Sequence, residues 1–417
     1  MGDKDLGCPP SFASASEAFS NFQIEFPHLP MNFSYIINEL GEERENYFDA
    51  IAPPIIQTSN FRVRKVDELK KLFEDEYSGY LYSRGQNPTV DILRKKLAAM
   101  DQAEDCLVFN SGAAAIFAAV LANSKSGDHI ISVDKPYSWV QRIFDNILSR
   151  FGVETTYIDG SRLENFEKAR RPNTRLIYLE SPSTWTFAIQ DIAGVAAFAK
   201  QYGITTLIDN SYCTPLYQQP IPLGIDLCMQ TATKYIGGHS DTLGGIITGS
   251  KERIKKIFDS EFLAVGSGIQ PFNAWLLIRS LRSLESRMAR ITESSWLVLD
   301  YLKKQPKIER VLFPLDKDFP QYELAKKQMK NACGLISFYV RAVSRQQIVK
   351  FCEGMKHIMM AVSWGGHESL ILARCTSLEN EQFDAGNPDH QLLRLYIGLE
   401  DPDYIIQDIE QSFRLSF

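Results

Sequence analysis

The sequence has few of the residues from which metal sites and disulfide frameworks are built. Its 417 residues include seven cysteines and six histidines, all scattered, with no C-x-x-C pair. An odd number of dispersed cysteines argues against both a disulfide framework and a metal site. The sequence therefore predicts no metal, and a reducing compartment, the cytoplasm, as the location.

Three other features are also missing. No apolar run reaches the length of about 20 residues that spans a membrane, and the N-terminus lacks the basic stretch and apolar core of a secretory signal. The net charge is only −6 and there is no local cluster of lysine and arginine, so we expect no nucleic-acid partner. Neither a G-x-G-x-x-G turn nor a P-loop occurs, which argues against a nucleotide-binding α/β protein.

Short apolar segments alternate with helical segments in the first two thirds of the chain. We expect strands at 106–109, 129–133, 175–179 and 205–208, and helices at 113–123, 141–151 and 192–202. This alternation is typical of a mostly parallel sheet that is covered on both faces. Ligands of such sheets lie at the carboxyl ends of the strands. The sequence thus predicts an α/β fold with its chemistry at those ends.

The last third of the chain has a different pattern, which predicts a smaller α+β domain. Its expected elements are a long helical stretch at 272–303, strands at 311–314 and 334–340, and a helix at 346–356. Because 334–340 alternates in polarity, we expect it in an open sheet with one solvated face. The predicted divisions are a leader and arm at 1–75 (with a mobile leader around 7–16), a large domain at 76–275 and a C-terminal domain at 276–417.

Lys234 lies in the most informative segment of the chain. It follows the apolar run 224–229 and precedes Gly237 and Gly238, so a strand delivers a lysine into a glycine-rich turn. Asp209 ends another apolar run upstream. A lysine that forms an imine and an aspartate that keeps a pyridine nitrogen protonated are the protein groups that pyridoxal phosphate (PLP) chemistry requires. The pair predicts PLP as the cofactor.

Small and hydroxyl-bearing residues near these positions are suited to a phosphate group. Gly112 and Ala113 join a strand to a helix, and the first N–H groups of a helix are unpaired and favour an anion. Thr231 and Thr233 add two hydroxyl groups just before Lys234. Close packing at the turn and the β preference of threonine explain the same residues without a ligand.

Four further side chains have chemistry that fits such a site, each with an ordinary alternative. Tyr137 could stack on a cofactor ring or simply pack at a sheet edge. Tyr82 and Arg84, two residues apart in an extended loop, could grip a phosphate or lie on the surface. Arg394 is a charge inside an apolar strand, and a buried arginine needs a carboxylate, which the protein or a substrate can supply.

Together these motifs resemble the Cys/Met-metabolism family of PLP-dependent enzymes, the transsulfuration enzymes. The resemblance covers about 52–417, and its most specific part is Ala232-Thr233-Lys234-Tyr235 followed by Gly238-His239-Ser240-Asp241. Other matching motifs are Tyr82-Ser83-Arg84, Ser111-Gly112, Glu180-Ser181-Pro182, Asp209-Asn210 and Arg394. The resemblance implies the type I fold of PLP-dependent transferases, which is aspartate-aminotransferase-like. That fold has a mostly parallel sheet in a large domain and a smaller α+β C-terminal domain.

The resemblance also implies roles for individual residues. Three would be catalytic: Lys234, which carries the cofactor and moves protons, Asp209, which holds the pyridinium, and Tyr137, which stacks on the ring. The phosphate would be bound by Gly112, Ala113, Thr231 and Thr233, with Tyr82 and Arg84 reaching in from a neighbouring subunit. The substrate, a small sulfur amino acid, would contact Arg394, Ser363, Trp364 and Thr184. Because the site borrows residues from a neighbour, we expect a homotetramer built as a dimer of dimers.

Several positions depart from the common family pattern. Ser138-Trp139 replace a pair of glycines, Thr184-Trp185 replace Asn-Pro, and Trp364 replaces the leucine of many γ-acting members. These changes occur together in bacterial-type cystathionine β-lyases, the group that the chain resembles most. We therefore expect a lyase of methionine biosynthesis that cleaves cystathionine or a related thioether by β-elimination, giving a thiol, pyruvate and ammonia.

Two alternatives to β-elimination stay open at this point. The first is γ-replacement or γ-elimination, because β- and γ-acting members share the whole core set of residues. The second is a protein of the PLP fold without lyase activity. We also hypothesise that Trp139, Trp185 and Trp364 share one aromatic pocket, which would suit a bulky thioether.

Overall fold

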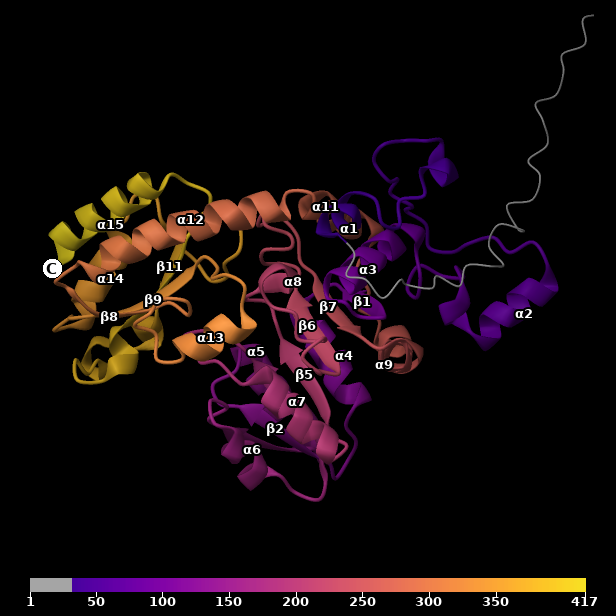
Figure 1. Cartoon of the computed structure of the whole chain (residues 1–417), viewed down its shortest axis with the longest axis horizontal. Helices are drawn as coiled ribbons and strands as arrows, with labels where there is room; N and C mark the ends of the chain where they lie inside the picture. Colours follow the sequence, from indigo (N-terminus) through magenta and orange to yellow (C-terminus); the bar gives the residue numbers. More distant parts are fainter. Residues whose placement is uncertain (1–31) are drawn as a thin grey trace, which may run out of the picture.

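The computed structural model describes residues 32–417 (Figure 1), so the expected leader around 7–16 lies outside the described residues. Two sheets organise the chain. A seven-stranded sheet is built from the middle of the sequence and a five-stranded sheet from its last third. This is the predicted α/β architecture with a smaller second sheet.

The larger sheet has the strand order β1-β7-β6-β5-β4-β2-β3. Its strands are β1 (Asp105–Phe109), β2 (His129–Val133), β3 (Glu154–Ile158), β4 (Thr174–Glu180), β5 (Thr205–Asp209), β6 (Leu227–Thr231) and β7 (Gly245–Gly249). The strands from β3 to β6 in this order pair in parallel, whereas β7 is antiparallel to both β6 and β1. The expected mostly parallel sheet is confirmed, and the strands β3 and β7 were not predicted from the sequence.

Helices cover both faces of this sheet, as expected for strands that are mostly buried, apart from the edge strand β3. The helices of the arm and the large domain are α1 (Phe33–Asn38), α2 (Val66–Glu74), α3 (Pro88–Met100), α4 (Gly112–Ala122), α5 (Ser138–Arg142), α6 (Leu163–Ala169), α7 (Ile192–Gln201), α8 (Thr214–Tyr217), α9 (Lys251–Ile257) and α10 (Leu263–Val265). Alternate strand residues face opposite ways. Thus Tyr178 and Leu207 pack with α4 and α9 in one cluster, whereas Ile177 and Ile208 pack with α6 and α7 in another.

The smaller sheet has the order β10-β11-β12-β9-β8. Its strands are β8 (Ile308–Leu312), β9 (Leu335–Val340), β10 (Met359–Met360), β11 (Leu370–Ala373) and β12 (Leu392–Tyr396), and the helices of this region are α11 (Pro271–Leu281), α12 (Leu284–Lys303), α13 (Tyr322–Gln328), α14 (Arg345–Glu353) and α15 (Pro402–Ser416). In Figure 1, α12 extends from α11, beside the large sheet, to the small sheet. The predicted domain limits at 75 and 275 stay a prediction.

Three local predictions were wrong. The stretch 272–303 is two helices, because the backbone leaves the helical conformation at Ser283. Strand β9 is buried on both faces rather than solvated on one, since α12 contacts it and its side chains join a closed core. The stretch 141–151 is not one regular helix: α5 starts at Ser138 and passes into a π-helical turn, Ile143–Ile147.

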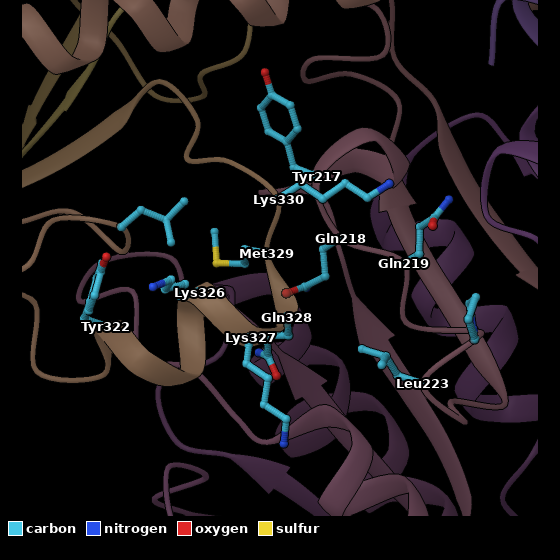
Figure 2. A pocket seen from close by; sticks show the side chains of 12 residues that line it. Tyr217, Gln218, Gln219, Leu223, Tyr322, Lys326, Lys327, Gln328, Met329 and Lys330 are labelled. Carbon is cyan, nitrogen blue, oxygen red and sulfur yellow. The ribbon is translucent and has the colours of Figure 1, made fainter. Parts of the chain in front are cut away.

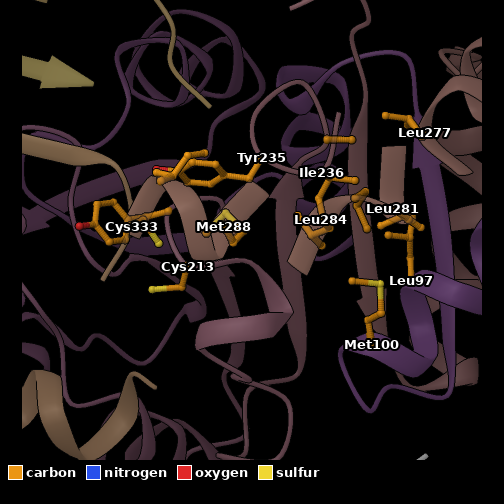
Figure 3. Close-up of a cluster of buried hydrophobic side chains, with 14 of the residues drawn as sticks. Leu97, Met100, Cys213, Tyr235, Ile236, Leu277, Leu281, Leu284, Met288 and Cys333 are labelled. Carbon is orange, nitrogen blue, oxygen red and sulfur yellow. The ribbon is translucent and has the colours of Figure 1, made fainter. Parts of the chain in front are cut away.

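A buried cluster lies where α3, α11 and α12 meet the segment that follows Lys234 (Figure 3). Tyr235 and Ile236 are buried there with Leu277 and Met288. Because these side chains are held in a packed core, the backbone of the preceding lysine is held with them.

The described part of the chain has no helix that could serve as a membrane span. In residues 32–417, no three metal-binding side chains of His, Cys, Asp or Glu converge. Six cysteines in this part are unpaired and buried, and Cys106 and Cys228 lie in strands as small buried side chains.

Candidate active site

Lys234 lies in the turn that follows β6, and its side chain points to a loop of the smaller domain. Its Nζ donates a hydrogen bond to Ser363 Oγ at 2.5 Å and lies 5.3 Å from the centre of the Trp364 ring. Burial and the positive charge of Arg394 lower the pKa of Lys234 to about 8, and Asp209 opposes this shift. A partly neutral amine close to a carboxylate is suited to imine formation and to proton transfer.

Asp209 is the last residue of β5 and is buried. Its Oδ1 accepts a hydrogen bond of 2.8 Å from the backbone N–H of Ser211. Burial raises the pKa of Asp209, while the Ser211 hydrogen bonds and the charge of Lys234 lower it. A buried carboxylate at this strand end is the partner that a protonated pyridine nitrogen needs, so this part of the site fits PLP.

The start of α4 forms a cradle for an anion. Ser111 caps the helix by accepting from the N–H of Ala114 at 3.2 Å, which leaves the preceding N–H groups of Gly112 and Ala113 for a ligand. A side chain at position 112 would collide with the Thr231 hydroxyl, so only glycine lets the helix start lie this close. The structure thus brings together two of the protein groups that were expected to bind the phosphate, a helix N-terminus and a threonine hydroxyl.

The fourth expected phosphate residue, Thr233, has a different set of contacts. Its hydroxyl accepts from the N–H of Gly244 at 3.1 Å and lies 3.4 Å from the oxygen of the same residue. It therefore joins the two ends of the turn that carries Lys234. A hydroxyl has one proton to donate, so a hydrogen bond to a phosphate would have to replace the long bond to the Gly244 oxygen.

Arg394 lies in the middle of β12 and is 8 % exposed. Its Nη1 donates to the hydroxyl and the carbonyl oxygen of Thr184 at 3.2 and 3.4 Å, and its guanidinium lies 5.0 Å from the centre of the Trp185 ring. Burial lowers its pKa to about 10, while Glu180 and Tyr235 oppose the shift. Neutral oxygen partners leave the positive charge free to bind a carboxylate.

A tight loop carries Ser363 and Trp364 to the lysine. Ser363 has a φ of 84° and Gly365 a φ of 88°, and a side chain at Gly365 would meet the backbone N of Tyr235 at 2.7 Å. The Tyr396 hydroxyl donates to the Gly366 oxygen at 2.7 Å. The loop therefore lies directly on the backbone of Lys234, which places Ser363 and Trp364 against its amine.

Tyr137 precedes α5 and is 42 % exposed, so part of its surface is available to a ligand. Its backbone N–H donates to Glu180 Oε2 at 2.7 Å. Glu180 was predicted only as part of the Glu180-Ser181-Pro182 motif, without a role of its own. Its position at the last residue of β4, where ligands of parallel sheets bind, was the signal that could have found it.

Some expected site residues are not brought to Lys234 within one chain. Tyr82 and Arg84 stack on each other at 5.6 Å and line a hollow on the arm with Asn60 and Phe61. No hydrogen bond joins either side chain to another predicted site residue in the part of the chain that the structure describes. Their predicted contribution to a neighbouring subunit's site stays a prediction.

The three tryptophans are distributed over different surroundings. Trp364 packs on Tyr235 with a ring separation of 5.3 Å. The guanidinium groups of Arg394 and Arg374 lie 5.0 and 5.3 Å from the centre of the Trp185 ring. Trp139 is 51 % exposed and pairs with Arg142 at 4.8 Å. Two of the three thus contact residues of the site, and the single shared pocket that we hypothesised gains no support from Trp139.

A separate groove lies between the segment Tyr217–Leu223 and α13 (Figure 2). It has a volume of about 680 Å³ and includes Lys326, Lys327 and Lys330 among its lining residues. None of the predicted site residues lines it. The groove is therefore separate from the predicted site residues at the strand ends.

Comparison with known proteins gives one consistent family. Residues 35–414 match the family of Cys/Met metabolism PLP-dependent enzymes. The chain is 35% identical to an L-methionine gamma-lyase of Treponema denticola over 88% of this chain and 93% of that protein. It is 35% identical to the cystathionine gamma-lyase of Bacillus subtilis over 89% and 96%, and 32% identical to the human cystathionine gamma-lyase over 93% and 95%.

Solved structures agree with these relatives. A crystal structure of metB from Corynebacterium glutamicum has a TM-score of 0.84 and 32% identity, covering 92% of this chain and 98% of that one. A cystathionine gamma-lyase from Lactobacillus plantarum complexed with L-serine has a TM-score of 0.84 and 30% identity, covering 93% and 99%. The chain therefore belongs to the Cys/Met metabolism PLP-dependent enzymes, with pyridoxal 5'-phosphate as its cofactor.

Proposed function

We propose that the chain is a PLP-dependent carbon–sulfur lyase of sulfur amino acid metabolism that acts by β-elimination on cystathionine or a related thioether. Membership of the family and relatives named L-methionine gamma-lyase and cystathionine gamma-lyase support the carbon–sulfur lyase. The choice of β-elimination rests on the surroundings of Lys234. The predicted place in methionine biosynthesis and in the cytoplasm rests on the sequence alone.

The residues of the site divide the work of such a reaction. PLP, when bound, supplies an electron sink for the pair released from a Cα–H bond. Arg394 binds the substrate carboxylate and Asp209 keeps the proton on the pyridine nitrogen. Lys234 takes the Cα proton and returns a proton to the sulfur that leaves Cβ. With one water, cystathionine then gives homocysteine, pyruvate and ammonia.

The contacts of the Lys234 amine support β-elimination. β-Elimination needs one carbon-bound proton removed, from Cα, whereas γ-elimination also needs one removed from Cβ, which requires a base with a longer reach. The amine donates to Ser363 Oγ and faces the ring of Trp364 at 5.3 Å. These two neighbours restrict the movement of the side chain. The two contacts are the observation that carries the preference, and we infer from them that the amine is confined.

γ-Elimination is the second candidate, and the names of the relatives favour it. Two relatives that are 35% identical are an L-methionine gamma-lyase and a cystathionine gamma-lyase. A γ-elimination would release 2-oxobutanoate in place of pyruvate. γ-Replacement would instead consume a thiol together with an activated homoserine.

The identity of the 2-oxo acid tests the proposal. The purified holoenzyme would be incubated separately with cystathionine, methionine, cysteine and O-acetylhomoserine, and pyruvate and 2-oxobutanoate would be separated and measured. We expect pyruvate and homocysteine from cystathionine. Mainly 2-oxobutanoate would rule out the β-elimination, and no 2-oxo acid from any of the four would rule out the lyase.

A pair of variants sharpens this test. Trp364→Leu removes the ring that faces the lysine, so we expect the share of 2-oxobutanoate to rise. Trp296→Leu is the control, because Trp296 packs on Phe313 in the smaller domain, at 4.9 Å between ring centres. An unchanged product ratio in Trp364→Leu would contradict the proposed effect of confinement.

A further inference from the structure

Two carboxyl groups, not one, lie buried side by side at the strand ends. Glu180 ends β4 and Asp209 ends β5, and the two residues are direct partners in the parallel ladder. Their exposed fractions are 6 % and 8 %. The proposed reaction uses Asp209 and leaves Glu180 without a role. A second buried carboxyl beside the first is costly unless it makes specific contacts.

Glu180 contacts residues from two separate parts of the site. Its Oε2 accepts from the backbone N–H of Tyr137, and the N–H of Thr184 also stabilises its charged form. Thr184 in turn accepts hydrogen bonds from Arg394. Glu180 thus connects the residue before α5 with the arginine of β12 through the segment that follows β4.

We propose that Glu180 is a positioning residue, whose carboxyl group holds the Tyr137 backbone in place and, in its neutral form, leaves the charge of Arg394 free for the substrate carboxylate. This inference rests on the proposed function of Arg394 and Tyr137. Under this proposal, the presence or absence of one proton on Glu180 changes how well Arg394 binds the substrate carboxylate. The ring of Tyr137 and the charge of Arg394 are then set by the same side chain.

The charges around Glu180 favour the neutral form. Burial, followed by the Asp209 carboxylate, raises the pKa of Glu180 to about 8, while the N–H groups of Tyr137 and Thr184 and the charge of Arg394 oppose this. The charge of Lys234 also belongs to this group, because it interacts with the charges of Arg394 and Asp209. Below that pH, Arg394 has no ionised partner in Glu180. Above it, the new negative charge competes with the substrate carboxylate for the guanidinium.

Steady-state kinetics of the holoenzyme test this over about pH 6 to about pH 9.5. In the wild type, KM for cystathionine should rise at the alkaline end. Glu180→Gln keeps a hydrogen-bond acceptor but cannot ionise, so its kcat at neutral pH should stay close to the wild type and its alkaline rise in KM should disappear. Glu180→Ala also loses the acceptor for Tyr137, and its kcat should fall by about 10-fold.

Asp408→Asn is the matched control. Asp408 is a buried carboxylate of α15 that accepts from the backbone N–H groups of residues 356–358 and from the Gln411 side chain, and none of these partners is a predicted site residue. Its variant should keep the wild-type dependence of KM on pH. If Glu180→Gln shows the same alkaline rise in KM as the wild type, or if Glu180→Ala and Glu180→Gln have equal kcat, the proposal is wrong.

Thermal unfolding of the holoenzyme gives a second measurement, which does not require turnover. Glu180 has a raised pKa in the folded state, so the folded chain holds this proton more tightly than the unfolded chain. Its contribution is greatest below pH 4.5 and is lost as the pH rises to about 8. The Tm of Glu180→Gln minus that of the wild type should therefore increase across this window. A constant difference would contradict the buried neutral acid, whereas a missing 2-oxo acid with an increasing difference would contradict only the proposed reaction.

Discussion

Two positive charges, Lys234 and Arg394, share one buried site. Burial is the main cause that lowers the pKa of both side chains, and the charge of Arg394 lowers the pKa of Lys234 further. The lysine therefore has an appreciable neutral fraction near pH 8, while the arginine stays charged. This difference suits their proposed roles, because a base must give up its proton and a carboxylate anchor must keep its charge.

Arg394→Leu tests the anchor. It removes a charge-assisted hydrogen bond to the substrate carboxylate, so we expect kcat/KM for cystathionine to fall by about 10- to 100-fold, mostly through KM. Steady-state assays at neutral pH would measure it. Arg374→Leu is the control, because Arg374 lies on the same Trp185 ring at 5.3 Å but pairs with Asp389. Equal losses in the two variants would show that Arg394 acts only by packing.

At the scale of elements, the site is built where β4, β5 and β6 end and α4 begins. Thr231 N donates to the Ser211 hydroxyl at 2.7 Å, and Ser211 N donates to Asp209, so the phosphate end and the ring end are linked through one serine. Gly112 lets α4 start against Thr231. A single glycine thus sets the distance between the helix N-terminus and the strand end.

Gly112→Ala is expected to weaken cofactor binding. The added methyl group would collide with the Thr231 hydroxyl, so α4 or the end of β6 must shift. We expect the Kd for PLP, measured by fluorescence titration of the apoprotein, to rise by about 10-fold or more. Gly386→Ala is the control, since its new methyl group would come no closer than 3.2 Å to Asp384. A wild-type Kd in Gly112→Ala would contradict the cradle.

Much of the larger sheet could be predicted because its strands are short, apolar and bounded by turns. Strand β2 matches its predicted range and β5 begins at the predicted residue. Asp209 was found because a charged residue at the end of an apolar strand is conspicuous, and Lys234 because it follows such a strand in a glycine-rich turn. Antiparallel β7 was missed, since Gly245–Gly249 carries glycine at both ends and has little strand signal.

Two features of the structure depend on contacts between segments that are distant in sequence, and these could not be predicted from the sequence. The helix break at Ser283 involves Arg287, which donates to the oxygens of Ser280 and Tyr235. Nothing local to 272–303, such as proline or glycine, marks this break. The role of Glu180 likewise depends on Tyr137, which is distant in sequence and joined to it only by the fold.

At the scale of the whole molecule, the arm carries large side chains that are exposed within a single chain. Tyr82 is 45 % exposed, and Phe48 and Phe73 are 96 % and 71 % exposed. Figure 1 shows this arm, with α2, at the margin of the molecule away from the small sheet. Large exposed apolar side chains in one region are typical of an interface between subunits. This agrees with the predicted sharing of Tyr82 and Arg84.

Mixing inactive variants tests the sharing of residues. Arg84→Ala and Lys234→Ala subunits would be unfolded together, refolded and assayed against each variant refolded alone. If Arg84 acts in a neighbour's site, hybrid pairs contain one intact site, and random pairing should restore about one quarter of wild-type activity. No recovery, with both variants refolded as oligomers, would place Arg84 and Lys234 in the same chain's site.

The central claim is that Lys234 is the lysine that carries the cofactor. Borohydride reduction of the yellow holoenzyme, followed by proteolysis and mass spectrometry, tests it most directly. Reduction converts the imine into a stable secondary amine, so the cofactor stays on its lysine. We expect the added cofactor mass on the peptide that contains Lys234, with no labelled peptide in Lys234→Ala. Label on a different lysine of the wild type, or a colourless protein that takes up no PLP, would contradict the account.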